Sequence, residues 1–475
     1  MKIGDVRWLR WMSAIDADMT RPSLDPVGPV GGGNGRGGSS ASGVETAATE
    51  THLSVADLTN RIGATAFAFR GYDVANLGRS RELLAHERYG PVVREVLDHF
   101  GSIASEALGE PIDLVRHIEE EDKTVLAKFA LDVASIVAME YAQLRLLEEF
   151  FAVPIHNARL SFGYSIGELT ALLFSGVYTV EQLLPIPLGL ARDSAELAED
   201  TTLGVLFTRG PTLPTKDVER LCRAVSSEGH GLIGPSAFLS PNTALLLGQH
   251  GTLDRIEALK AHFLPEKTML RRNPNQWPPL HSPLVWRKLI PNRVAVVLYS
   301  REGGTRKPSP PVISCVTGSA SYDEQNSRDI LTDWTDHPQR LWDVIDESLS
   351  AGVEVVVHVG PAPSLIAATF ARLANNVSRQ MGNSYLQRLG RGLVSEMNRH
   401  AWLARILPSK SALLRLPFLV HVMLEDWLLE QPLPQPEATS IIMAQPIGNG
   451  STAEAAEAIH VQEAGAGAEA AAPTS

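Results

Sequence analysis

The sequence predicts an α/β fold: a core with a parallel sheet, an inserted ferredoxin-like subdomain, a helical C-terminal extension and disordered ends. Three observations predict it. Short β-branched runs closed by glycine, such as "VEVVVHVGP" (353–361), alternate with helical patterns, as in a parallel sheet covered on both faces. Residues 201–276 instead follow the order strand, helix, strand, strand, helix, strand, which is the ferredoxin-like order. Residues 27–44 are rich in glycine and serine, which is typical of a flexible linker.

The chain has 475 residues, enough for two or three domains. Residues 64–69 and 157–165 are predicted strands, and residues 90–108 and 124–150 are predicted helices. The second of these helices is apolar on most faces, so we expect it to be buried. The predicted division is a flexible leader with a Gly-rich linker (1–60), an α/β core in two pieces (61–200 and 277–372), the ferredoxin-like subdomain (201–276), a basic helical extension (373–432) and a disordered tail (433–475).

Composition excludes several classes of protein. The net charge of -12 argues against a general nucleic-acid binder, which is usually basic. Only two cysteines occur, so the cysteines offer no metal cluster. One disulfide is possible, but nothing in the sequence indicates it, and we expect a reducing, cytoplasmic location. The N-terminus lacks a continuous apolar run, and no apolar run approaches the roughly 18 residues of a membrane span. We therefore expect neither a secretory signal nor a membrane segment.

A G-x-S-x-G motif lies in "RLSFGYSIGELTALLFSGV" (159–177), between a predicted strand and a predicted helix. In this context the motif forms a nucleophile elbow, a tight turn that needs small residues two positions either side of the serine. Gly163 and Gly167 supply them around Ser165. The helix N-terminus favours negative charge at the serine, and the N–H of Ile166 would form half of an oxyanion hole. The alternative is a glycine-flanked turn with a capping serine. The elbow predicts a hydrolase-like core.

A nucleophilic serine needs a base, and the chain has 14 histidines. His281, in "WPPLHSPLV", is the candidate, because its proline-stiffened loop could hold an imidazole in a fixed place. The alternative is a histidine on a surface loop. The sequence pattern alone does not pair His281 with Ser165.

Four segments in order resemble one family, the malonyl-CoA:acyl-carrier-protein transacylases and the acyltransferase domains of polyketide synthases. "FGYSIGELTALLFSGV" resembles their G-H-S-x-G-E segment, and "LHSPLV" resembles the segment with the catalytic histidine. "ATAFAFRGYDVANLGRSREL" is similar to the first strand and its F-P-G-Q-G-S-Q loop, and "GVEVVVHVGPAPSLIAATF" to the closing strand and V-G-P turn. The resemblance covers roughly residues 62–373.

The resemblance implies ping-pong acyl transfer. Ser165 would attack the thioester of an acyl-CoA while His281 takes its proton. The oxyanion would lie against the N–H groups of Ile166 and Tyr72. The acyl group would then pass to the phosphopantetheine thiol of an acyl carrier protein. The expected partners are thus acyl-CoA and a carrier protein, with no cofactor, no metal, no nucleic acid and no membrane.

The chain departs from the family at several positions. Tyr164 replaces the usual histidine beside the serine, and Tyr72 replaces the first glutamine of the G-Q-G-S-Q loop. The family grips malonyl with an arginine about 25 residues after the serine, where this chain has Leu190. Arg192 is a substitute only if Pro185 and Pro187 shift the helix register, because residues two apart on a helix face directions about 200° apart.

Two further departures lie around the histidine. "PPLH" matches neither the common malonyl nor the common methylmalonyl signature. The glutamine that orients the family's histidine is also missing, and "LTDWTDHPQRLW" offers Asp333 or Trp334 near that place.

These departures leave several functions open. Malonyl is the family substrate, but Leu190 would favour a neutral acyl group, because an unpaired buried carboxylate is costly. The alternatives are a thioester hydrolase on the same fold, a hydrolase of the α/β-hydrolase class and a non-catalytic scaffold. The stretch 372–415 has eight Lys or Arg and one acid, Glu396. It is either a docking face for an acidic carrier protein or a solvated helical face.

Overall fold

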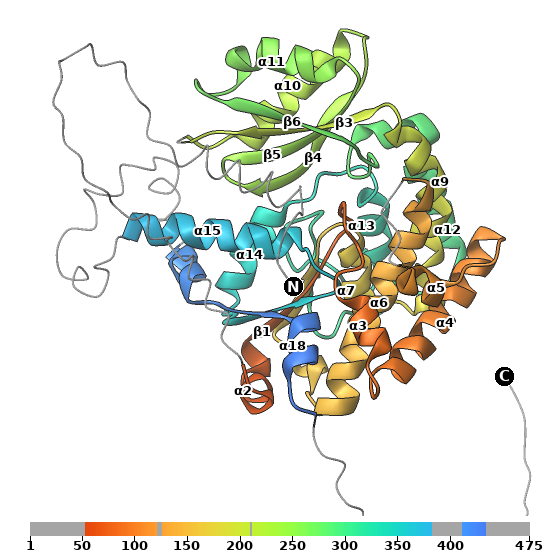
Figure 1. Cartoon of the computed structure of the whole chain (residues 1–475). Helices are drawn as coiled ribbons and strands as arrows, with labels where there is room; N and C mark the ends of the chain where they lie inside the picture. The colour runs from red at the N-terminus through yellow and green to blue at the C-terminus, as the bar shows by residue number, and fades with distance from the viewer. Residues whose placement is uncertain (1–52, 121–125, 210, 382–410, 434–475) are drawn as a thin grey trace, which may run out of the picture. The chain divides into compact units, whose positions relative to one another are not determined.

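A five-stranded parallel sheet forms the centre of the core (Figure 1). The computed structural model describes residues 53–120, 126–209, 211–381 and 411–433. The strand order is β7-β2-β1-β8-β9. The strands are β1 (Thr65–Phe69), β2 (Leu160–Gly163), β7 (Val312–Ile313), β8 (Val355–Val359) and β9 (Val420–Met423). The parallel sheet that the sequence predicts is therefore present.

The two faces of this sheet belong to different hydrophobic cores, because successive side chains of a strand point to opposite faces. In β1, Phe67 and Phe69 belong to a core with the helices of one face. Ala66 and Ala68 belong to a second core with the helices of the other face and with the small sheet. The first core is built by α4 (Gly90–Leu108), α6 (Phe129–Phe151), α7 (Ile166–Phe174) and α9 (Pro185–Ala198), and the second by α14 (Leu341–Ser350) and α15 (Leu365–Met381). As predicted, α6 is buried over most of its length.

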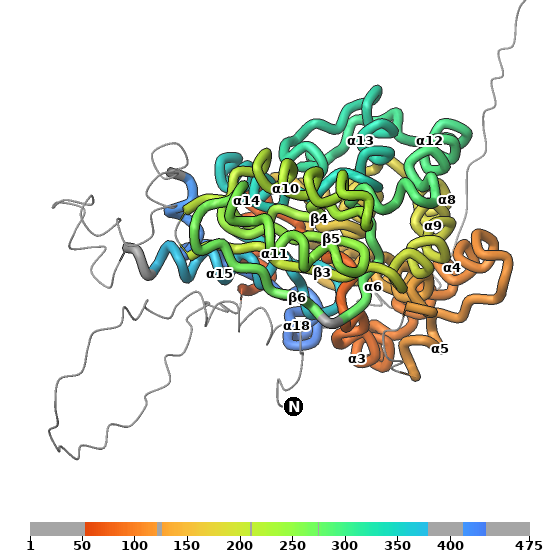
Figure 2. Tube along the Cα trace, turned by 90° about the horizontal axis from the view of Figure 1, so that it is seen from above, coloured from red at the N-terminus to blue at the C-terminus, as the bar shows by residue number. Residues whose placement is uncertain are grey.

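A second, antiparallel sheet of four strands follows α9, in the order β4-β5-β3-β6. Its elements are β3 (Thr201–Phe207), α10 (Thr215–Ser227), β4 (Ile233–Ser240), β5 (Thr243–Gln249), α11 (Thr252–Phe263) and β6 (Met269–Gln276). They follow one another in the order that the sequence predicts. Helices α10 and α11 cover the face of this sheet that is turned away from the core (Figures 1 and 2). The other face shares a core with the large sheet, through side chains such as Val205 and Phe207.

The N-terminal boundary of the fold lies earlier than the sequence predicts. Helix α2 (Val55–Asn60) falls within the predicted flexible leader, and Leu58 is fully buried. Leu53 is also buried, and its carbonyl oxygen accepts a hydrogen bond from the indole of Trp427 (2.7 Å). The prediction of a flexible leader over residues 1–60 is thus wrong for residues 53–60. Residues 1–52 lie outside the described residues.

The helical extension predicted for residues 373–432 is not continuous over 413–429. The segment forms a 3-10 helix η6 (Ser411–Phe418), then β9, then helix α18 (Leu424–Glu430). Pro417 lacks an N–H group and disfavours a continuous helix, and the β-branched Val420 and Val422 pair in parallel with β8. The basic extension is therefore not purely helical. Residues 382–410, which hold most of its cations, and residues 434–475 lie outside the described residues.

Several of the remaining helices, such as α3 (Ser80–Ala85) and α12 (Ile290–Ser300), add residues to the first core. None of the described helices has the length and apolar character needed to cross a membrane. The two cysteines are buried in different hydrophobic cores and are not bonded to each other. The other elements are η1 (Ile62–Ala64), α5 (Leu114–Glu119), η2 (Leu126–Lys128), η3 (Ile155–Asn157), α8 (Val180–Leu183), η4 (Pro283–Lys288) and α13 (Ser327–Asp333).

Candidate active site

Ser165 occupies a sharp turn between β2 and α7. Its backbone has φ 57° and ψ -119°, a conformation that residues with a side chain rarely adopt. A Cβ on Gly163 would overlap with the backbone of Gly167, and a Cβ on Gly167 would overlap with the carbonyl oxygen of Phe69. Close backbone approach therefore explains both glycines of the motif, and the turn has the geometry expected of a nucleophile elbow.

Surrounding hydrogen bonds hold this strained turn. The backbone N–H of Ser165 donates to the side-chain oxygen of Gln339 (3.1 Å), and the carbonyl oxygen of Ser165 accepts from the indole N–H of Trp334 (3.0 Å). The N–H of Tyr164 donates to the carbonyl oxygen of Phe69 (3.1 Å). Strained backbone persists where such contacts over-determine it, and this is common at functional sites.

His281 lies in the loop between β6 and η4 and reaches the serine. Its Nε2 is 2.7 Å from Ser165 Oγ, and its Nδ1 is 2.6 Å from the carbonyl oxygen of Trp334. A carbonyl oxygen can only accept, so Nδ1 carries the proton. Nε2 then offers its lone pair to the serine hydroxyl. The structure thus brings together the two residues that the sequence could not pair, in the orientation a general base needs.

Burial keeps this imidazole neutral. His281 is buried, and desolvation lowers its pKa to about 4, against the opposing effects of the Trp334 carbonyl and the charge of Asp336. Its own backbone is held in a positive-φ conformation (62°), with its N–H donating to the carbonyl oxygen of Thr335 (2.7 Å). A backbone carbonyl therefore orients the imidazole where many hydrolases use a carboxylate.

Gln339 is the site residue that sequence reasoning missed. It is fully buried, and besides accepting from Ser165 its Nε2 lies 3.2 Å from Nδ1 of His281. Its main chain bonds to β4, where its N–H donates to Ser236 and its carbonyl oxygen accepts from Phe238 (both 2.8 Å). Gln339 thus joins the serine to the small sheet and lies beside the imidazole, without a hydrogen bond to it, because Nδ1 and the amide nitrogen are both donors. The only sequence signal was a polar residue inside "HPQRLW".

Of the two residues predicted to orient the histidine, the structure selects Trp334. Its main-chain carbonyl binds His281, and its fully buried ring packs edge-on against the imidazole, with centroids 5.0 Å apart. Asp333 is exposed and does not contact His281.

The predicted oxyanion-hole residues lie on the two segments that flank the serine. Ile166 is the first residue of α7, where N–H groups have no partner within the helix. The loop after β1 lies against the elbow, because a Cβ on Gly71 would be 3.3 Å from Ser165 Cβ and 2.7 Å from the carbonyl oxygen of Tyr164. The next residue, Tyr72, packs its ring against Phe129 (centroids 4.8 Å apart). Their roles in the oxyanion hole stay a prediction.

Arg192 is not part of the site. Its side chain is 92 % exposed and pairs with Glu196 (3.4 Å), whereas Leu190, on the same helix α9, is buried in the first core. The prolines of α9 do not shift the register, so the two residues face different directions as the helical period requires. The idea that Arg192 replaces the missing arginine is therefore wrong.

Arg70, which directly follows β1, is also bound to other groups of the protein. Arg70 is buried and donates to the carbonyl oxygens of Gly71 (2.8 Å), Pro361 (2.6 Å) and Ala75 (3.1 Å), and to the side chain of Asn76 (2.8 Å). It holds the loop that carries Gly71 and Tyr72. Its donors are used by the protein and are not directed at a ligand.

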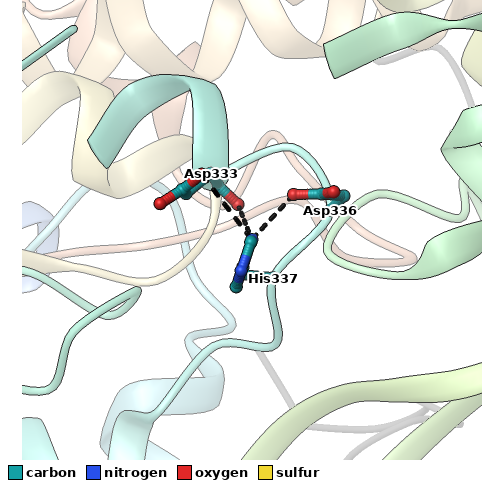
Figure 3. A group of neighbouring side chains, drawn as sticks. All are labelled: Asp333, Asp336 and His337. Carbon is teal, nitrogen blue, oxygen red and sulfur yellow. Dashed lines mark hydrogen bonds and ion pairs between the residues drawn. The ribbon is translucent and has the colours of Figure 1, made fainter. Parts of the chain in front are cut away.

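One group of side chains has a composition that metals accept: Asp333, Asp336 and His337, next to Trp334 (Figure 3). Nδ1 of His337 is already bonded to Asp336 (2.7 Å), and the other carboxylate oxygen of Asp336 accepts from the indole of Trp286 (2.7 Å). We assign no metal to this exposed group.

Comparison with known proteins finds likeness at the level of structure. No protein-family model matches the chain, and no curated protein matches it. Many solved structures do, and those most similar share the fold of malonyl-CoA:acyl carrier protein transacylases. The chain therefore has this transacylase fold.

Three of these structures are particular enzymes. MCAT from Streptococcus pneumoniae is 23 % identical, with a TM-score of 0.53 over 65 % of this chain and 92 % of that chain. The acyl carrier protein S-malonyltransferase from Vibrio cholerae is 20 % identical, with a TM-score of 0.51, and the match covers 65 % of this chain and 94 % of that chain. FabD from Acinetobacter baumannii is 20 % identical, with a TM-score of 0.51, and the match covers 65 % of this chain and 90 % of that chain.

Proposed function

We propose that the chain is an acyltransferase that moves an acyl group from acyl-CoA to the thiol of an acyl carrier protein. The observation that carries this proposal is the 2.7 Å contact between His281 Nε2 and Ser165 Oγ on a strained elbow. The transacylase fold of the structural neighbours supports it, because these neighbours include acyl carrier protein S-malonyltransferases.

In the first step, Ser165 Oγ attacks the thioester carbonyl carbon while Nε2 of His281 takes the hydroxyl proton. The carbonyl oxygen becomes an oxyanion, which the N–H groups of Ile166 and Tyr72 stabilise. The carbon–sulfur bond then breaks, and His281 returns the proton to the departing CoA sulfur. The products are acyl-Ser165 and CoA.

The second step is the reverse reaction with a new thiol. The carrier thiol gives its proton to His281 and attacks the acyl-serine carbonyl carbon. The bond to Ser165 Oγ breaks, and Oγ recovers the proton. No metal or redox cofactor takes part in either step.

We further propose that the acyl group is neutral. The position at which the family has an arginine is Leu190, which is buried in the apolar core, and Arg192 faces solvent. Burying a malonyl carboxylate there without a partner would cost roughly several kcal/mol. Acetyl or a longer uncharged acyl group avoids that penalty.

The experiment is intact mass spectrometry after exposure of the full chain to acetyl-CoA or malonyl-CoA, with peptide mapping of the adduct. We expect an acetyl adduct on Ser165, little malonyl adduct, and none in Ser165→Ala. Strong malonylation would refute the neutral-acyl proposal, and an unmodified serine would point to a non-catalytic scaffold. Rapid loss of the adduct to water without a thiol acceptor would favour a thioester hydrolase.

A further inference from the structure

Large hydrophobic side chains gather on the surface of one segment, immediately after the histidine loop. In the part of the chain that the structure describes, five such residues are exposed, and four of them lie between residues 286 and 299. They are Trp286, Leu289, Val296 and Tyr299, with Val296 the most exposed at 69 %. We call these four residues the α12 surface.

The helix explains why these side chains face out. Helix α12 buries Ile290, Val294 and Leu298, which are spaced by four residues and so lie on one side. Val296 and Tyr299 are three residues apart on the other side, so the packing of α12 leaves them uncovered. Trp286 and Leu289 extend the apolar surface toward the start of the helix.

Basic residues are concentrated in the sequence of this segment, although the chain as a whole is acidic. Residues 286–307 contain six Lys or Arg and a single acid, Glu302, whereas the whole chain has a net charge of -12. Three of the cations form partly exposed ion pairs with acids on or just after α9, and these pairs offset part of the positive charge. They are Arg287 with Asp200, Lys288 with Asp193 and Glu196, and Arg293 with Asp193.

The α12 surface is connected to the catalytic residues. It begins five residues after His281, and the indole N–H of Trp286 donates to Asp336 (2.7 Å). Asp336 is two residues from Trp334, whose carbonyl holds the imidazole. A protein bound on the α12 surface would therefore contact the segments that carry the histidine and its partner.

We propose that the α12 surface is the docking site for an acidic carrier protein, with Leu289 and Val296 as apolar contacts and the flanking cations as its electrostatic complement. This inference rests on the proposed function, which requires a carrier thiol at Ser165. Complementary charge favours this occupant, because an acidic partner is attracted to the cations of this segment. A second copy docking through the same surface would instead bring like charges together.

Binding is measured by fluorescence anisotropy with the labelled holo acyl carrier protein of the organism that makes the chain, at low and high salt. The test variants are Leu289→Asn, which suits the left-handed backbone at this position (φ 51°), and Val296→Glu. Phe418→Glu is the matched control, because Phe418 is also exposed (63 %) but lies on η6. Acylation of Ser165 by acyl-CoA is followed in parallel and should be unchanged in all three variants.

We expect each α12 variant to weaken carrier binding by roughly tenfold, as loss of an apolar contact in an interface commonly does, and the control to bind within about twofold of the wild type. High salt should weaken wild-type binding. Equal affinity of the α12 variants and the wild type, or no carrier binding by the wild type, would overturn the inference. Failure of the proposed function is distinguishable, because it would appear as an unmodified Ser165 in the wild-type chain, whereas anisotropy needs no acylation.

Discussion

The low pKa of His281 makes a sharp prediction about acidic pH. A free histidine has a pKa of 6.5, and burial lowers that of His281 to about 4. At a pH of about 5.5, roughly 97 % of the buried imidazole would be neutral, against roughly 9 % of an unperturbed one. Because only the neutral imidazole can accept the proton of Ser165, the acylation rate at that pH should be about tenfold higher than an ordinary histidine would allow.

Stability must be followed in the same experiment, because the same shift destabilises the folded state in acid. Between pH 6.5 and about 4, the unfolded histidine binds a proton that the folded one does not. The folded state therefore loses stability as pH falls through this window, by up to about 3 kcal/mol from this residue. Circular dichroism at each pH would identify the range in which the chain remains folded.

The assay is single-turnover acylation by acetyl-CoA, quenched in acid and quantified by intact mass at each pH. Within the folded range, we expect the rate to stay nearly constant down to about pH 5 and to fall by half near the lowered pKa. A midpoint near 6.5 in a fully folded chain would refute the reasoning, because it would mean that the base is not the desolvated imidazole.

Substitutions at three further positions test the account of the site. Trp334→Phe keeps the carbonyl that binds His281 but removes one of the two donors to the carbonyl oxygen of Ser165, the other being the N–H of Glu168, so thermal denaturation should show a loss of about 0.5–1.5 kcal/mol, and kcat should fall more than KM changes. Gln339→Leu should do the same by orphaning the N–H of Ser165, while Gln339→Glu, which keeps an acceptor oxygen, should retain more activity; equal losses would show that this hydrogen bond is unimportant. Arg192→Ala should leave the ratio of acetyl to malonyl transfer within about twofold, because surface ion pairs contribute little, and a large change in that ratio would place Arg192 in the site after all.

The elbow could be predicted from the sequence because its constraints are local. The two glycines, the serine and the strand and helix around them all lie within one short stretch, and the turn permits few alternatives. His281 could be proposed from its proline-rich loop and its resemblance to a known segment. Its contact with Ser165, 116 residues away, required the structure.

Gln339 and β9 escaped prediction because long-range contacts define them. Gln339 is 174 residues from Ser165, and nothing in its own neighbourhood marks a buried amide that joins two chain segments. Strand β9 has four residues and gains its hydrogen bonds only by lying beside β8, so its local pattern resembled part of a helix. Arg192 was left open by the sequence because two nearby prolines could have altered the helix register, and only its observed exposure settled the question.

The central claim is that the hydroxyl of Ser165, activated by His281, accepts an acyl group. The most direct measurement is peptide-mapped mass spectrometry of the chain after a short incubation with acetyl-CoA, with His281→Ala measured alongside. The account predicts one acetyl group on the peptide that contains Ser165, and at least about a hundredfold slower labelling in His281→Ala. Acetyl groups found elsewhere on the chain, or equal labelling of Ser165 in both proteins, would contradict it.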